Sequence, residues 1–150
     1  MKIAVSSDER TQLVDAVLEE LRRRGHEAAY FGPAAGGEAD WPEVTLQAAG
    51  QVAGGQADQA IVMCWTGTGC TIAANKVPGI RAALCHDAAT AKGARIWNHA
   101  NVLALSLRAT PDAIAKEILD AWFETPYSDD DWNLRQMQRI KDLEQKYGGR

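Results

Sequence analysis

The sequence has few cysteines, no excess of basic residues and no long apolar run, and each absence narrows the function. Its 16 Lys and Arg against 20 Asp and Glu leave a net charge of −4. This balance argues against a nucleic-acid surface, which needs a basic stripe. No apolar run reaches the roughly 18 residues of a membrane span. We therefore expect neither nucleic acid nor a membrane as a partner.

The three cysteines, Cys64, Cys70 and Cys85, are an odd set without the spacing of metal ligands. Cys64 and Cys70 flank a flexible loop, and reduced thiols are the simplest interpretation. The N-terminal segment from Met1 reads directly as a strand and does not have the form of a signal peptide. These features predict a soluble cytoplasmic protein with no bound metal.

The residues that are present predict one α/β domain. At 150 residues, with 46% hydrophobic and 24% charged, the chain is long enough for a proper core. Strand-like and helix-like segments alternate five times with short connections, which is typical of a parallel sheet covered on both faces. We predict a single domain over residues 1–150, an extra helix from about 130 to 147, and five strands at 2–6, 28–31, 60–63, 80–85 and 102–105.

The stretch 58–76 carries most of the chemistry. An apolar run ends at Cys64, and the loop Thr66–Gly69 then leads into a helical stretch of small residues. Glycines before a helix expose backbone N–H groups at its positive end, where phosphate or another oxyanion binds. Two glycines could instead serve only the backbone of the turn. Because a thiol, hydroxyl groups and glycines come together here, we predict a site.

Two further strands are followed by polar residues, Asp8-Glu9 and His86-Asp87. In parallel sheets, ligands bind beyond the carboxyl ends of the strands, so these residues would lie at the same edge as Cys64. The segment Trp97-Asn98-His99 precedes the fifth strand and belongs to the opposite edge. It could therefore serve a pocket on a neighbouring subunit.

Several of these segments together resemble one family. Cys64-x-Thr66-Gly67-x-Gly69, then Ile72–Lys76 and Pro78–Leu84, is similar to the ribose-5-phosphate isomerase B / galactose-6-phosphate isomerase family. The resemblance continues in the Ser-Asp turn after the first strand, in Asn98-x-x-Asn101-Val102-Leu103-Ala104 and in Arg135-x-x-x-Arg139, and it runs from Met1 to about Leu143.

The resemblance implies a Rossmann-like three-layer α/β/α sandwich that forms a homodimer or tetramer with shared pockets. It implies an isomerase that interconverts aldose and ketose sugar phosphates through a cis-enediol, without metal or nucleotide. One branch of the family uses a thiol base at the position of Cys64, and another uses a glutamate at the position of Cys70. Cys64 is thus the expected base, with Thr66 bonding a sugar oxygen and the amides from Gly67 to Cys70 stabilising the enediolate. A small buried hydrophobe is the alternative for each cysteine.

The resemblance also supplies candidates for binding the phosphate. Arg135 and Arg139 are four residues apart and share a helical face, where two guanidinium groups match a phosphate. Arg108, after the fifth strand, is a third cation. A solvated charged face is the alternative for each arginine. The full set of expected substrate-binding residues is Asp8, Glu9, Trp65, Gly67, Thr68, Gly69, Cys70, Asn98, Arg108, Arg135 and Arg139.

The sequence departs from the family at three places. Glu9 stands where the family has a histidine that helps to hold phosphate, and Trp65 stands where it has glycine. Trp97 replaces the histidine that opens the sugar ring, so either His99 takes over that role or ring opening is left to solvent. Alternatively, both tryptophans pack and His99 is a satisfied histidine at a helix end.

These departures leave the sugar open: a tetrose, a hexose or a modified pentose is at least as consistent as ribose 5-phosphate. They also leave two other functions open. One is a non-catalytic protein that binds or senses a sugar phosphate, and the other is an isomerase of an unphosphorylated sugar.

Overall fold

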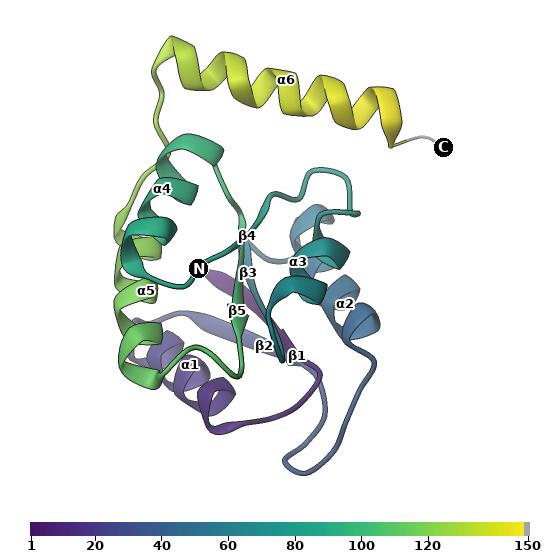
Figure 1. Cartoon of the computed structure of the whole chain (residues 1–150), viewed down its shortest axis with the longest axis vertical. Helices are drawn as coiled ribbons and strands as arrows, with labels where there is room; N and C mark the ends of the chain where they lie inside the picture. Colours follow the sequence, from purple (N-terminus) through teal and green to yellow (C-terminus); the bar gives the residue numbers. More distant parts are fainter. Residues whose placement is uncertain (149–150) are drawn as a thin grey trace.

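The computed structural model describes residues 1–148 as a parallel sheet with helices on both faces (Figure 1). The strands are β1 (Lys2–Ser7), β2 (Glu27–Phe31), β3 (Gln59–Cys64), β4 (Ala82–Leu84) and β5 (Val102–Ser106). The helices are α1 (Gln12–Arg23), α2 (Trp41–Ala53), α3 (Thr68–Ala74), α4 (Ala88–Asn98), α5 (Asp112–Glu124) and α6 (Asp131–Tyr147). The predicted α/β fold with a five-stranded parallel sheet is confirmed. Gly149 and Arg150, at the end of the predicted domain, lie outside the described residues.

The fourth strand is shorter than predicted. We expected residues 80–85 to be extended, but β4 contains only Ala82–Leu84. At the start of β4, two backbone amides are hydrogen-bonded to asparagine side chains. The Arg81 amide donates to Asn101 Oδ1 at 2.8 Å, and the Ala82 amide donates to Asn75 Oδ1 at 2.9 Å. Because these amides are bonded to side chains, the ladder with β5 begins only at Ala82.

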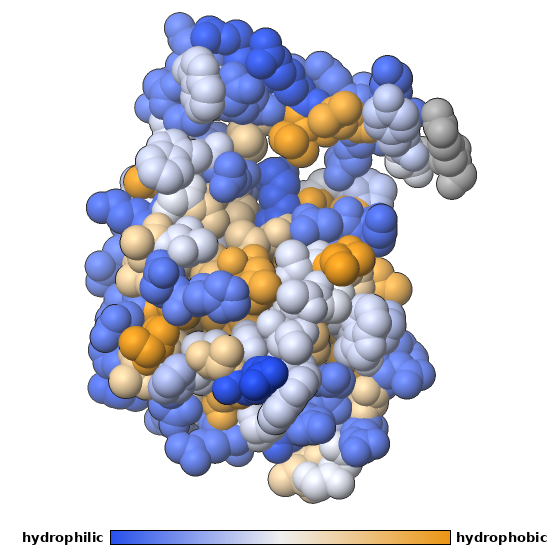
Figure 2. Space-filling view, viewed as in Figure 1, coloured by the Kyte–Doolittle hydropathy of each residue, from blue (hydrophilic) through white to orange (hydrophobic). Residues whose placement is uncertain are grey.

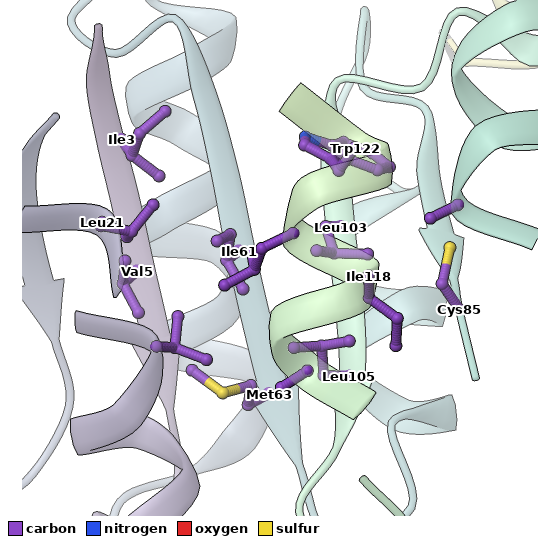
Figure 3. Packing of buried hydrophobic residues seen from close by; sticks show 14 of the residues in the cluster. Ile3, Val5, Leu21, Ile61, Met63, Cys85, Leu103, Leu105, Ile118 and Trp122 are labelled. Atoms are coloured by element: carbon purple, nitrogen blue, oxygen red, sulfur yellow. The ribbon is translucent and has the colours of Figure 1, made fainter. Parts of the chain in front are cut away.

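The two faces of the sheet carry side chains of different size. Successive residues of a strand point to opposite faces. In β1 and β3, large residues such as Ile3 and Ile61 face α1 and α5 (Figure 3). Ala4 and Ala60 lie on the other face, against α2 and α3. The small face lets α2 and α3 pack closely on the sheet. Cys64 belongs to this small face.

The strand order is β2-β1-β3-β5-β4. From β1 the chain moves to β2 on one side, and from β3 it moves to the edge strand β4 on the other side and then back to β5, so the order reverses between β1 and β3. In open parallel sheets, ligands bind at this reversal, beyond the carboxyl ends of the strands. Asp8 follows β1 and Cys64 ends β3, which places both residues at the reversal point.

Helix α6 lies apart from the layers and crosses one end of the domain (Figure 1). Glu144 of α6 connects the helix to the domain, because its Oε1 accepts a hydrogen bond from the Gly79 amide at 2.8 Å. Within residues 1–148, none of the helices combines the length and the apolar character that crossing a membrane requires.

Candidate active site

The turn after β3 is built around a glycine that the fold requires. Gly67 has φ 78°, in the left-handed region, and caps the start of α3. A Cβ at this position would lie 2.5 Å from Leu84 Cδ1 and 3.1 Å from the Leu105 carbonyl. Only glycine fits these two constraints. The turn brings the first residues of α3 back over the sulfur of Cys64.

Two groups of Cys70 contact the Cys64 sulfur. The Cys70 amide donates to Cys64 Sγ at 3.4 Å, and the Cys70 thiol is also hydrogen-bonded to that sulfur. Both bonds favour a negatively charged sulfur. The bond from the Cys70 thiol is the largest cause and outweighs burial, which alone would raise the pKa, so the pKa of Cys64 is lowered to about 6. At neutral pH the Cys64 sulfur is therefore mainly in the thiolate form.

The same contact has the opposite effect on Cys70. Its proton is needed to donate to Cys64, and the side chain is fully buried, so the pKa of Cys70 is raised well above the usual range of a thiol. Its thiol also lies 3.2 Å from the Gly67 carbonyl, a second acceptor. Of the two cysteines, Cys64 therefore supplies the thiolate and Cys70 the thiol.

Of the backbone amides from Gly67 to Cys70 that were expected to bind an oxyanion, some are already hydrogen-bonded within the chain. The Gly67 amide donates to the Cys64 carbonyl at 3.2 Å, and the Cys70 amide donates to Cys64 Sγ. Within the described residues, the amides of Thr68 and Gly69 donate to no acceptor. Two of the four predicted amides thus remain for an oxyanion next to Cys64.

Cys64 opens onto a small pocket of about 300 Å³, which is lined by Asp8, Trp41, Cys64, Trp65, Thr66, Thr68 and Gly69. The hydroxyl groups of Thr66 and Thr68 are 2.7 Å apart and hydrogen-bonded. Asp8 Oδ1 is buried without a hydrogen-bond partner, and burial raises the pKa of this carboxyl. An unpartnered buried acceptor is ready to bond a hydroxyl group of a ligand.

Trp41 is a pocket residue that was not among the expected site residues. Its indole packs over Gly69, where an added Cβ would lie 3.2 Å from the ring. It is the first residue of α2, and its side chain remains 42% exposed. The only available signal was its place between a glycine-rich loop and a helix-starting proline, which does not specify contact with the loop after β3.

The remaining expected site residues lie outside this pocket. Glu9 pairs through its backbone with Glu38 in an isolated bridge, and its side chain is exposed. The Arg108 amide donates to the Trp65 carbonyl at 3.1 Å, so this arginine is near the loop, with its side chain exposed. Asp87 Oδ1 accepts the Thr90 amide at 2.6 Å and caps α4.

A second hollow, of about 950 Å³, lies between α6 and the domain. It is lined by Asn75, Ile80, Arg81, Ala82, Trp97, Asn98, Trp132, Gln136, Met137, Arg139, Ile140, Leu143, Glu144 and Tyr147. Figure 2 shows hydrophobic side chains gathered on the side of α6 that faces the domain. Arg139 and Asn98 thus share one hollow, which does not contain Cys64. Arg135 is exposed on the same helix.

His99 is engaged within its own chain. Its ring is 9% exposed, stacks on Tyr127 with centroids 4.5 Å apart, and has Nε2 2.8 Å from the Ser128 carbonyl. A carbonyl only accepts, so Nε2 carries a proton. These contacts tie the segment before α6 to the end of α4. They favour the interpretation of His99 as a satisfied helix-end histidine over that of a proton-transfer group.

Among residues 1–148, no group of three or more His, Cys, Asp or Glu side chains is arranged to hold a metal ion. The geometry is instead that of a thiolate, a small polar pocket and a separate cationic hollow.

Comparison with known proteins assigns the fold and the loop to one family. Residues 3–143 match the family described as Ribose/Galactose Isomerase. The chain belongs to this family. It is 38% identical over 125 residues to ribose-5-phosphate isomerase B of Escherichia coli, covering 83% of this chain and 81% of the relative. It is 35% identical over 129 residues to D-erythrulose-4-phosphate isomerase of Pectobacterium atrosepticum, covering 85% of each.

The solved structures agree. Ribose-5-phosphate isomerase B of Clostridium thermocellum superposes with a TM-score of 0.93 at 37% identity, covering 98% of this chain and 99% of that chain. The resemblance drawn from the sequence is therefore confirmed, and the protein is an aldose–ketose isomerase of the ribose/galactose isomerase family.

The structure also explains two asparagines in the segments that resemble this family. Asn75 accepts the Ala82 amide and donates to the Ala82 carbonyl, each at 2.9 Å. Asn101 accepts the Arg81 amide at 2.8 Å and donates to the Gly79 carbonyl at 2.9 Å. Both residues hold the short β4 strand and its approach, so their role is structural.

Proposed function

We propose that this isomerase interconverts the aldose and ketose forms of a phosphorylated sugar, with the Cys64 thiolate as the base. The observation that carries the proposal is the pair of hydrogen bonds from Cys70 to the Cys64 sulfur, which keeps that sulfur charged at neutral pH. A base must be unprotonated and within reach of the substrate. Cys64 meets the first condition, and it lines the pocket at the strand-order reversal.

In the proposed reaction, Cys64 removes the proton from C2 of the open-chain aldose. The negative charge that develops on the C1 oxygen is stabilised by the amides of Thr68 and Gly69. The protonated Cys64 then returns the proton to C1, while a proton moves from the C2 oxygen to the C1 oxygen to complete the ketose. The Thr66 hydroxyl and the Asp8 carboxylate bond sugar hydroxyl groups.

We further propose that the phosphate binds arginines of a second subunit. Arg139 lies in the hollow under α6 and Arg135 is exposed on the same helix, so within one chain neither lines the Cys64 pocket. Helix α6 also carries exposed apolar side chains, those of Leu134, Ile140 and Leu143. A second copy that covers these residues would bring its own Cys64 pocket towards Arg139 and Asn98, and the two-fold symmetry of a dimer would create two such sites.

The small volume of the pocket limits the size of the sugar that can bind. Trp41 and Trp65 both line the approximately 300 Å³ beside Cys64. Such a pocket favours a short carbon chain, and one relative is named an isomerase of D-erythrulose 4-phosphate. The substrate is accordingly to be sought among phosphorylated sugars of four to six carbons.

The test is a panel of four- to six-carbon aldose and ketose phosphates in deuterated buffer, followed by NMR. We expect one of them to exchange its C2 proton for deuterium and to convert to the other form. The unphosphorylated sugars serve as the matched control. Binding of a sugar phosphate without any exchange would contradict the proposal and favour a sensing protein, and exchange of the unphosphorylated sugars alone would refute the phosphate part.

A further inference from the structure

The Cys64–Cys70 pair has a property that the isomerase reaction does not use. The reaction needs one sulfur as a base, but the turn brings a second thiol to the same place: the Cys70 amide donates to Cys64 Sγ at 3.4 Å, and the Cys70 thiol lies 3.2 Å from the Gly67 carbonyl within that turn. Between them are Gly67 and Gly69, two residues without side chains. Cys64 lines a pocket that is open to small molecules.

We propose that Cys64 and Cys70 form a peroxide-reactive dithiol, which hydroperoxides convert reversibly into a Cys64–Cys70 disulfide. The reactant class is a small hydroperoxide, with hydrogen peroxide as its simplest member. The disulfide would consume the sulfur that serves as the base, so the inferred loss of activity rests on the proposed function. The disulfide itself does not.

The chemistry proceeds in two steps. The Cys64 thiolate attacks the outer oxygen of the hydroperoxide, the O–O bond breaks, and the departing oxygen takes a proton and leaves as alcohol or water. Cys64 is thereby oxidised to a sulfenic acid. The Cys70 sulfur then attacks the Cys64 sulfur, the S–O bond breaks, and hydroxide leaves with the Cys70 proton as water. Two thiols have been oxidised and one hydroperoxide has been reduced.

The geometry assigns a separate role to each sulfur. Cys64 reacts first because it carries the charge and lines the pocket, and the thiolate is the nucleophilic form. Cys70 is fully buried behind it and meets the peroxide only through Cys64. Its thiol, shared between Cys64 Sγ and the Gly67 carbonyl at 3.2 Å, must turn from the carbonyl to the sulfenic sulfur. The third cysteine, Cys85, belongs to the opposite face of the sheet.

The sequence makes the product simple to detect. No Lys or Arg lies between Arg24 and Lys76, so trypsin leaves Cys64 and Cys70 in one peptide and Cys85 in another. Native protein is treated with hydrogen peroxide, the remaining thiols are blocked, and the protein is digested with trypsin. The masses of the peptides are then measured by mass spectrometry. We expect the peptide 25–76 to lose the mass of two hydrogen atoms and to take no blocking group, and dithiothreitol to reverse both changes.

Three variants sharpen the test. In Cys70→Ala, Cys64 should stop at a sulfenic acid that dimedone traps, and in Cys64→Ala, Cys70 should stay a free thiol. Cys85→Ala should behave as the unchanged protein. Thiols that stay free under peroxide, or oxidation of Cys64 past sulfenic acid with Cys70 still reduced, would overturn the inference. A disulfide found in a protein with no isomerase activity would refute the proposed function and leave the inference standing.

Discussion

At Cys64, two opposing effects set the charge of the sulfur. Burial disfavours the thiolate, whereas the thiol and amide of Cys70 favour it. The hydrogen bonds prevail because both donors come from one residue that the turn at Gly67 holds over the sulfur. The reactivity of Cys64 is therefore a property of the pair. For Cys70, the contact argues against the alternative of a merely buried hydrophobe.

The pH dependence of activity should report this pair. The pKa of Cys64 is lowered to about 6, and the base acts when unprotonated, so kcat/KM should rise with pH to a midpoint near that value and then stay level. In Cys70→Ala the thiol donor is lost, and a hydrogen bond to a charged group contributes about 1.5–3 kcal/mol. The midpoint should therefore move upward by about one to two pH units. Cys85→Ala is the control, and an unmoved midpoint in Cys70→Ala would contradict the pairing.

Replacing the proposed base itself should have a larger effect. Cys64→Ser puts a hydroxyl where the thiolate was, and a hydroxyl is a far weaker base at neutral pH. We expect kcat to fall by about 10²–10⁴-fold. Circular dichroism and the melting temperature should show an unchanged fold, since serine is nearly the size of cysteine. An activity close to that of the unchanged protein would rule out Cys64 as the base.

At the scale of elements, asparagines take the place of ladder hydrogen bonds around β4. Asn75→Ala would remove both bonds to Ala82. Because these bonds are exposed to solvent, we expect a loss of about 1–2 kcal/mol in the free energy of unfolding. Urea denaturation would measure it, with Asn98→Ala at the exposed end of α4 as a matched control that should stay within about 0.5 kcal/mol. Equal stability of the two variants would show that β4 does not depend on Asn75.

The elements could be predicted from the sequence because their signals are local. The alternation of apolar runs and helical patterns located all five strands, and the loop after Cys64 was identified from its glycines and thiol. The start of β4 could not be predicted, because it depends on hydrogen bonds from side chains outside the strand, those of Asn75 and Asn101. Trp41 and the contact of Cys70 with Cys64 also depend on tertiary packing, which no spacing encodes.

At the scale of the whole molecule, one chain keeps apart the two regions that we propose form a single site. The thiolate pocket lies at the reversal point of the sheet, and the hollow with Arg139 lies under α6. The His99–Tyr127 stack and the Glu144 bond to Gly79 hold α6 in place across the end of the domain. A helix held in this position with apolar residues exposed is suited to receive a second copy of the chain.

The proposed sharing of sites between subunits predicts rescue between inactive chains. Cys64→Ser lacks the base, and Arg139→Ala lacks a phosphate contact, so each variant alone should have low activity at limiting substrate. In a mixed dimer, one site combines both lesions and the other has neither. After subunit exchange, half of the dimers are mixed and each has one intact site, so activity should recover to roughly a quarter of that of the unchanged protein. Exchanging Arg139→Ala with the double variant Cys64→Ser/Arg139→Ala is the control, because no site then has an arginine at 139. Sedimentation establishes whether exchange has formed dimers, and mixed dimers without recovered activity would place Arg139 outside the neighbouring site.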